Sequence, residues 1–115
     1  MQPDIITLPN IQFVGGSAET LRFYLKKSDG IQSFDAYGAT VNFAITRYEN
    51  QHGIPCVSKT ATLEQNTDGT SSIAVVELIT SDTLNLYGKF LYQITIKDAS
   101  GKPEIPYYGC IYIIN

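Results

Sequence analysis

Histidine and cysteine, which often act as the base and the nucleophile of an enzyme, are scarce in this sequence of 115 residues. The sequence contains one histidine, His52, and two cysteines, Cys56 and Cys110. A histidine beside a cysteine can act as the base that activates a thiolate, but no motif marks such a pair here. A Cys/His zinc site needs four side-chain ligands, and these three side chains cannot supply them. The sequence therefore predicts no catalytic residue and no metal site, and it predicts that His52 is an exposed loop residue.

Acidic residues could instead bind calcium or form the carboxylate pair of a glycosidase. The aspartates to consider are Asp29, Asp35, Asp68, Asp82 and Asp98. None of them belongs to a D-x-D-x-D-G calcium loop, and no motif points to a carboxylate pair. Aspartates in turns routinely accept hydrogen bonds from nearby backbone N–H groups. We therefore predict that these residues shape turns.

The composition is that of a folded domain with little charge. Hydrophobic residues make up 43% of the sequence, charged residues 17%, and the net charge is −3. A disordered chain is more polar, and a nucleic-acid-binding protein usually has a basic excess. The N-terminus lacks the features of a signal peptide, and Glu77 interrupts the longest apolar stretch. We expect no cofactor, no nucleic-acid or membrane partner, and synthesis in the cytoplasm, from which the protein leaves only inside a larger particle.

Alternation of apolar and polar residues predicts strands along most of the chain. In residues 40–48, for example, Val41, Phe43 and Ile45 share one face. In residues 89–97 one face carries Phe90, Tyr92, Ile94 and Ile96. Further strands are predicted at residues 20–26, 59–63, 72–78 and 107–114. One helical turn is predicted at residues 81–86, capped by Thr80 or Ser81.

About seven short strands without a long helical period predict an all-β fold, an immunoglobulin-like antiparallel β-sandwich. An eight-stranded barrel is the alternative. No repeat or linker divides the chain, so residues 1–115 are predicted to form a single domain. Immunoglobulin domains often join their sheets by a disulfide, but the tryptophan that packs on it is missing here. We expect Cys56 and Cys110 to be reduced, mostly buried thiols, with a disulfide between them as the alternative.

Two stretches of the sequence resemble motifs of a known protein family. Residues 33–45 read Ser-Phe-Asp-Ala-Tyr-Gly-Ala-Thr-Val-Asn-Phe-Ala-Ile. Residues 80–113 include Thr-Ser-Asp-Thr, Gly-Lys-Phe-Leu-Tyr-Gln-Ile, Asp-Ala-Ser-Gly and Gly-Cys-Ile-Tyr-Ile. They resemble the runs D-L-T-G-A-T-V-x-F-x-I and T-x-x-D-T … G-x-Y-x-Y-x-I … D-x-x-G … G-x-I-x-V of one family. That family is the immunoglobulin-like N-terminal domains of phage baseplate upper proteins and related prophage tail proteins.

The sequence departs from the family pattern at Ala36-Tyr37, where Leu-Thr is usual, and at Phe90, where Tyr is usual. The long C-terminal stem of full baseplate upper proteins has no counterpart in it, which favours an accessory module. The resemblance implies a non-enzymatic virion protein assembled in the host bacterial cytoplasm. It would be a tail or baseplate adaptor that docks on other phage structural proteins as a homo-oligomer or symmetric assembly. Capsid decoration, a head-fibre protein, and a carbohydrate-binding or adhesion module are the alternatives.

The predicted last strand is apolar or aromatic on both faces. If Gly109, Ile111 and Ile113 face the core, the alternate side chains face outward. A strand that is apolar on both sides is covered on both sides, and tyrosine is enriched in interfaces. The cover is either another protein or the chain's own residues 5–14. The candidate interface residues here are Tyr108, Tyr112, Ile114 and Leu91.

A second group of candidate interface residues comprises Tyr24, Ile73 and Val75. If Ala74, Val76 and Leu78 face the core, Ile73 and Val75 face outward beside Tyr24. Either a partner or a loop of the same chain is expected to cover them.

Residues 1–16 are predicted to be an N-terminal arm that docks on, or exchanges with, a neighbouring copy. Pro9 and Gly15-Gly16 flank its apolar part like hinges. Gly15-Gly16-Ser17 also resembles a fragment of a phosphate-binding loop, but the Gly-Lys-Ser/Thr and the helix of such a loop do not follow. We therefore interpret these residues as a turn that leads into the next strand.

Overall fold

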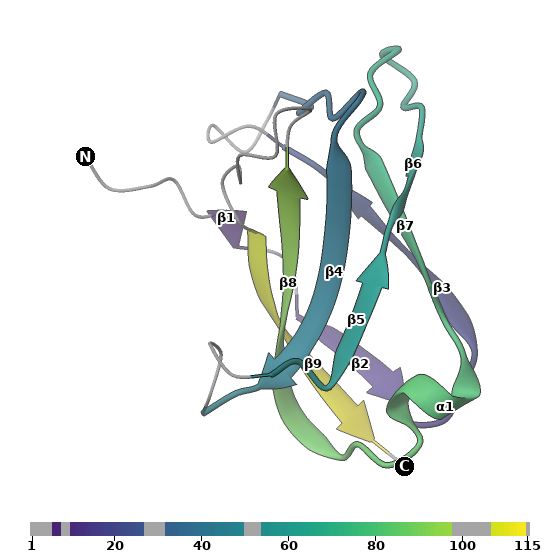
Figure 1. The fold of residues 1–115 in the computed structure, drawn as a ribbon, viewed down its shortest axis with the longest axis vertical. Helices are drawn as coiled ribbons and strands as arrows, with labels where there is room; N and C mark the ends of the chain where they lie inside the picture. The colour runs from purple at the N-terminus through teal and green to yellow at the C-terminus, as the bar shows by residue number, and fades with distance from the viewer. Residues whose placement is uncertain (1–5, 8–9, 27–31, 50–53, 98–106, 115) are drawn as a thin grey trace.

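The computed structural model describes residues 6–7, 10–26, 32–49, 54–97 and 107–114. These residues form nine strands and one short helix, which are arranged as two sheets packed face to face (Figure 1). The elements are β1 (Ile6–Thr7), β2 (Ile11–Val14), β3 (Glu19–Tyr24), β4 (Thr40–Arg47), β5 (Val57–Thr60), β6 (Thr62–Glu64), β7 (Ile73–Leu78), α1 (Thr80–Thr83), β8 (Gly88–Lys97) and β9 (Tyr107–Ile114). α1 is the only helix among them, and no helix in the described ranges is long and apolar enough to cross a membrane.

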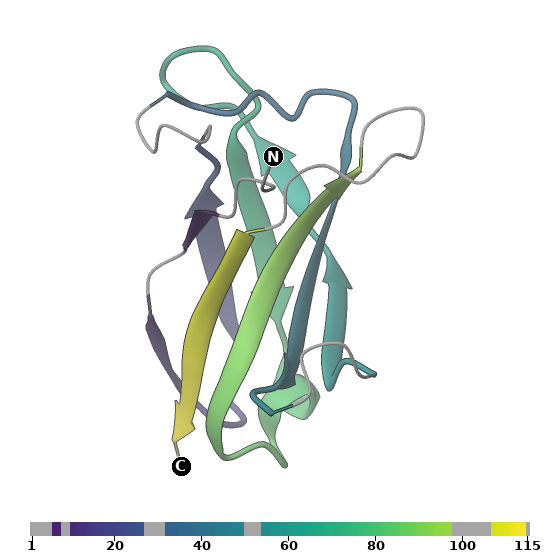
Figure 2. The same ribbon diagram turned by 90° about the vertical axis from the view of Figure 1, so that its left-hand side faces the viewer.

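The large sheet has six strands in the order β1-β9-β8-β4-β5, with β2 also paired to β9, and the small sheet has the order β3-β7-β6. β1 and β2 run parallel to β9, whereas all the other pairs are antiparallel. Figure 2 shows the two layers from the side. The prediction of an immunoglobulin-like β-sandwich is confirmed. The barrel alternative is wrong, because the described strands form two separate sheets.

The strand predicted at residues 59–63 is two strands on different sheets. β5 pairs with β4 in the large sheet, and β6 pairs with β7 in the small sheet. At the crossing point the Ala61 N–H donates to the Val41 carbonyl at 2.8 Å. The chain continues in extended form through Ala61, so alternation of side chains gives no sign that the hydrogen-bonding partner changes there.

Lys59 lies on β5, at the edge of the large sheet, on the same side as the core residue Val57. Its Nζ is 3.0 Å from Oδ2 of Asp82 in α1. An inward-pointing charge on an edge strand discourages the addition of a foreign strand. This ion pair therefore closes the edge of the sandwich between β5 and α1.

The helical turn begins one residue earlier than predicted and has a different cap. α1 spans Thr80–Thr83, and the residue at its N-cap position is Ile79, not Thr80 or Ser81. The Ile79 N–H donates to Asp82 Oδ2 at 2.8 Å. The carboxylate inside the first turn thus satisfies the backbone N–H group that precedes the helix, as in the second half of a capping box.

The core contains the inward residues of the predicted strands, including Val41, Phe43 and Ile45. The rings of Phe23, Phe43 and Tyr92 form a cluster with centroids 5.4 to 6.0 Å apart, which joins the two sheets. Tyr92 is fully buried, and this burial raises the pKa of its hydroxyl group. Gly109 lies opposite Tyr92 on β9, where an added Cβ would be 2.6 Å from Tyr92 Cζ. The buried ring therefore requires glycine at position 109.

Both cysteines are free, so the alternative of a disulfide is wrong. Cys56 precedes β5 and Cys110 lies in β9, with β4 and β8 between these two strands in the large sheet. The expectation that both thiols are mostly buried is also wrong. Cys56 is exposed, because it lies before the strand begins, and Cys110 is half-buried on the outer side of β9.

Candidate interaction surface

Asp35 and Asp68 shape turns as predicted, whereas Asp82 lies in α1 and pairs with Lys59. Asp35 Oδ1 accepts hydrogen bonds from the N–H groups of Tyr37 and Ser71, both at 3.1 Å. Asp68 Oδ1 accepts hydrogen bonds from the N–H of Thr70 at 3.0 Å and from its hydroxyl at 2.5 Å. The bonds from Thr70 lower the pKa of Asp68 to about 2. Asp68 thus binds groups of its own turn, whereas Asp35 joins its turn to the segment at Ser71.

Other sequence candidates for chemistry contribute little to a site. His52, Asp29 and Asp98 lie outside the described residues. Within the described ranges, no group of three or more His, Cys, Asp or Glu side chains lies close enough to hold a metal ion. Gly16 has a φ of +83° in the turn between β2 and β3, and its N–H donates to Thr83 Oγ1 at 2.9 Å. The interpretation of Gly15-Gly16-Ser17 as a turn is confirmed.

The structure brings together the four candidates predicted on the last two strands. Tyr108, Tyr112 and Ile114 point outward from β9, and Leu91 points outward from the neighbouring β8. Register places Leu91 beside Cys110, Gln93 beside Tyr108, and Lys89 beside Tyr112. Ile114 is 45% exposed and the other three candidates are half-buried. We call the outward residues of β4, β8 and β9 the outer face of the large sheet.

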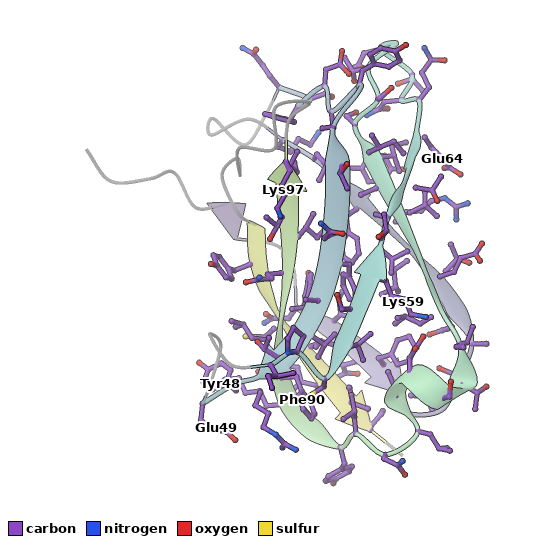
Figure 3. The ribbon with its side chains drawn as sticks, viewed as in Figure 1. Tyr48, Glu49, Lys59, Glu64, Phe90 and Lys97 are labelled. Carbon is purple, nitrogen blue, oxygen red and sulfur yellow. The ribbon has the colours of Figure 1, made fainter. Side chains whose placement is uncertain are left out.

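Two parts of this face were not identified from the sequence. Thr46 points outward from β4 beside Leu91, yet it is only 3% exposed. Lys89 lies over the ring of Tyr48, with its Nζ 4.0 Å from the ring centroid, and 5.9 Å from that of Tyr112. A hydrogen bond with Tyr48 raises the pKa of Lys89. Figure 3 shows Tyr48 and Glu49 at the end of the large sheet where β8 begins, near Phe90. The position of Lys89 beside Tyr112 follows from strand register, which the sequence alone did not supply.

The second group of candidates lies on the outer face of the small sheet, where Tyr24 is beside Ile73. Tyr24 is 54% exposed, but Ile73 and Val75 are each only 8% exposed. Arg22, beside Val75 on β3, and Glu64, beside Ile73 on β6, form an ion pair of 3.2 Å between Nε and Oε1. This pair joins the strands that flank β7. The expectation of a loop or a partner over Ile73 and Val75 is therefore corrected: side chains of their own sheet surround them.

The described strands of the N-terminal segment lie beside β9 in the sheet, not over its outer face. β2 pairs with the edge of β9 from Ile11 beside Ile111 to Val14 beside Ile114, and the Gly15 N–H donates to the Ile114 carbonyl at 2.6 Å. Phe13 is buried in the core. The expectation that residues 5–14 cover this face is thus wrong for the described residues 11–14, which extend the sheet sideways. Exchange of the arm between copies stays a prediction.

Comparisons with known proteins find likeness in structure and none in sequence. The sequence matches no family model, and no curated protein matches it. The fibronectin(III)-like modules of Clostridium thermocellum CbhA are similar in structure, with a TM-score of 0.49 and 10% sequence identity. That match covers 91% of this chain and 86% of the other. By its own strand order and register, the chain is an immunoglobulin-like β-sandwich with one self-covered outer face and one outer face on which apolar and aromatic side chains gather along β9.

Proposed function

We propose that this chain is a non-catalytic protein-binding module that docks through the outer face of the large sheet. One observation carries the proposal. Aromatic and aliphatic side chains of β8 and β9 gather on that face, and no described segment of the chain lies over them. Interface cores are enriched in tyrosine, which combines a large apolar ring with a polar tip. Tyr108, Tyr112 and Leu91 would form the centre of the contact, with Ile114 at its end.

We also propose that the module belongs to a phage or prophage particle, as a tail or baseplate adaptor in a symmetric assembly with other structural proteins. The support is the sequence resemblance at residues 33–45 and 80–113. These two stretches include most of β4, all of α1 and β8, and most of β9. They therefore contribute the strands that form the proposed docking face. Its location would be the virion, in the tail or, alternatively, on the capsid.

The experiment uses purified particles from the strain that encodes the chain, with the tagged chain expressed during particle production. We expect the tagged chain to co-purify with the particles, and Tyr108→Asp to release it without unfolding it. Tyr24→Asp is the matched control, because it places the same charge on an exposed tyrosine of the opposite outer face. Retention of Tyr108→Asp, or equal loss of both variants, would contradict docking through the large sheet.

The oligomeric state separates the particle module from the remaining candidate. Light scattering of the purified chain should show a ring or another symmetric oligomer. A monomer that binds glycans through its exposed tyrosines would instead favour a carbohydrate-binding or adhesion module.

A further inference from the structure

The outer face of the large sheet carries charge of one sign. The described outward positions of its strands β4, β8 and β9 include two lysines, Lys89 and Lys97, and no aspartate or glutamate. The outward positions of the flanking strands β2 and β5 carry no charged residue. The whole chain, in contrast, has a net charge of −3. Interfaces place potentials of opposite sign against each other, because this speeds encounter and rejects wrong partners. A partner for this face would therefore bring acidic side chains.

The two lysines differ in how firmly they are held. Lys89 lies over the ring of Tyr48 and within reach of the ring of Tyr112. Lys97 is at the other end of β8, and the cation–ring contacts among the described residues involve Lys89 alone. An ordinary exposed lysine loses much side-chain entropy when it pairs with a carboxylate. A lysine already held by two rings loses less, so Lys89 is the better prepared of the two.

No carboxylate among the described residues forms an ion pair with Lys89. The ion pairs there are Arg22 with Glu64 and Lys59 with Asp82. Glu49 lies at the same end of the sheet as Tyr48 (Figure 3), yet it forms neither of these pairs. Tyr48 also favours the charged ammonium group by raising its pKa. The N–H groups of Lys89 that do not contact the tyrosines are thus free to meet a carboxylate from outside.

We propose that Lys89, held by Tyr48 and Tyr112, is the anchor that receives a carboxylate of an acidic protein partner. The inference rests on the proposed function and specifies the chemistry of the partner. Leu91 and Cys110, side by side on the next outward positions, would supply the adjoining apolar contact. Two lysines at opposite ends of a strand do not form the dense basic array that grips phosphates or an anionic membrane. An acidic protein surface with apolar surroundings fits the face better.

A titration with short poly-L-glutamate tests the anchor without the native partner. Amide chemical shifts of Tyr48, Lys89 and Tyr112 should move on addition of the peptide and return as NaCl is added. Lys89→Gln should abolish these shifts, whereas Lys97→Gln, the matched lysine of the same strand, should leave them. Equal shifts around both lysines, no shifts, or shifts that survive Lys89→Gln would overturn the proposal. Circular dichroism should confirm that each variant is folded.

Particle binding then separates the two proposals. Lys89→Glu should lower retention on the particles about tenfold, more than Lys97→Glu does. If Tyr108→Asp releases the chain and Lys89→Glu does not, the carboxylate anchor is wrong and docking through the face still holds. If both variants are retained like the unmodified chain, the docking face itself is wrong.

Discussion

The two outer faces of this sandwich carry similar aliphatic residues at outward positions, but these residues are buried to different extents. Ile73 and Val75 on β7 and Leu91 on β8 are all aliphatic side chains at outward positions of interior strands. On the small sheet, Arg22 and Glu64 come from the two flanking strands and pair with each other. On the large sheet, the outward neighbours of Leu91 on the adjacent strands are Thr46 and Cys110. Only on the small sheet do long charged side chains from both flanking strands meet across the strand that carries the aliphatic residues.

This difference shows that outward apolar residues do not by themselves mark an interface. Long side chains of arginine and glutamate cover apolar surface with their aliphatic parts while their charged ends stay in water. Short neighbours such as threonine and cysteine cannot do so. The identity of the cross-strand neighbours therefore decides whether an outward apolar residue is available to a partner.

The largest expected effect tests the contrast between the inner and outer sides of β9. Gly109→Ala should cost about 3 kcal/mol of unfolding free energy, because the added methyl group collides with the buried ring of Tyr92. Denaturant unfolding of the variant and the unmodified chain measures this loss of unfolding free energy. Cys110→Ala, the next residue but on the outer side, is the control and should cost less than about 1 kcal/mol. Similar losses in the two variants would mean that the ring of Tyr92 moves aside freely.

The next effect compares the two outer faces directly. Val75→Asp should destabilise the fold by about 2 kcal/mol, because the carboxylate would be largely buried on β7 and would compete with Glu64 for Arg22, the residue beside it. Leu91→Asp, on the half-buried outer face of the large sheet, should cost less than about 1 kcal/mol and should instead weaken docking. Thermal unfolding and particle retention, measured on both variants, check this. A reversed order of stabilities would remove the distinction between a self-covered and an available face.

The smallest effect concerns the turn that joins β6 to β7 and so closes the small sheet at one end. Bonds from Thr70 lower the pKa of Asp68 to about 2 from an ordinary value of 3.8. A carboxylate with a lowered pKa stabilises the folded state above about pH 4, and this contribution is lost as the pH falls toward 2. Asp68→Asn should therefore be slightly less stable than the unmodified chain at pH 7 and equally stable near pH 2. Unfolding curves across this range test it, and a difference that persists at pH 2 would argue against the carboxylate charge as its cause.

Much of the fold was predictable because side-chain alternation is a local property. The faces of β4 and β8 were assigned correctly from residues such as Phe43 and Ile94, which are fully buried. The switch of sheets at Ala61 was not predictable, because the chain stays extended while its partner strand changes. The parallel pairing of β2 with β9 was also missed, since it joins residues about 100 positions apart. The turn at Asp68 was predicted correctly because its hydrogen bonds connect residues close in sequence, whereas the bond from Ser71 to Asp35 spans 36 positions.

The candidate surface was likewise predictable only in part. The sequence by itself determined that β9 is apolar on both faces and that Tyr108, Tyr112 and Leu91 point away from the core, because the period of a strand is two residues. Only the tertiary structure decided that these side chains share one face, that Lys89 lies between Tyr48 and Tyr112, and that Arg22 and Glu64 pair across β7. Strand order and register set these neighbours, and they depend on contacts between distant segments that no local pattern encodes.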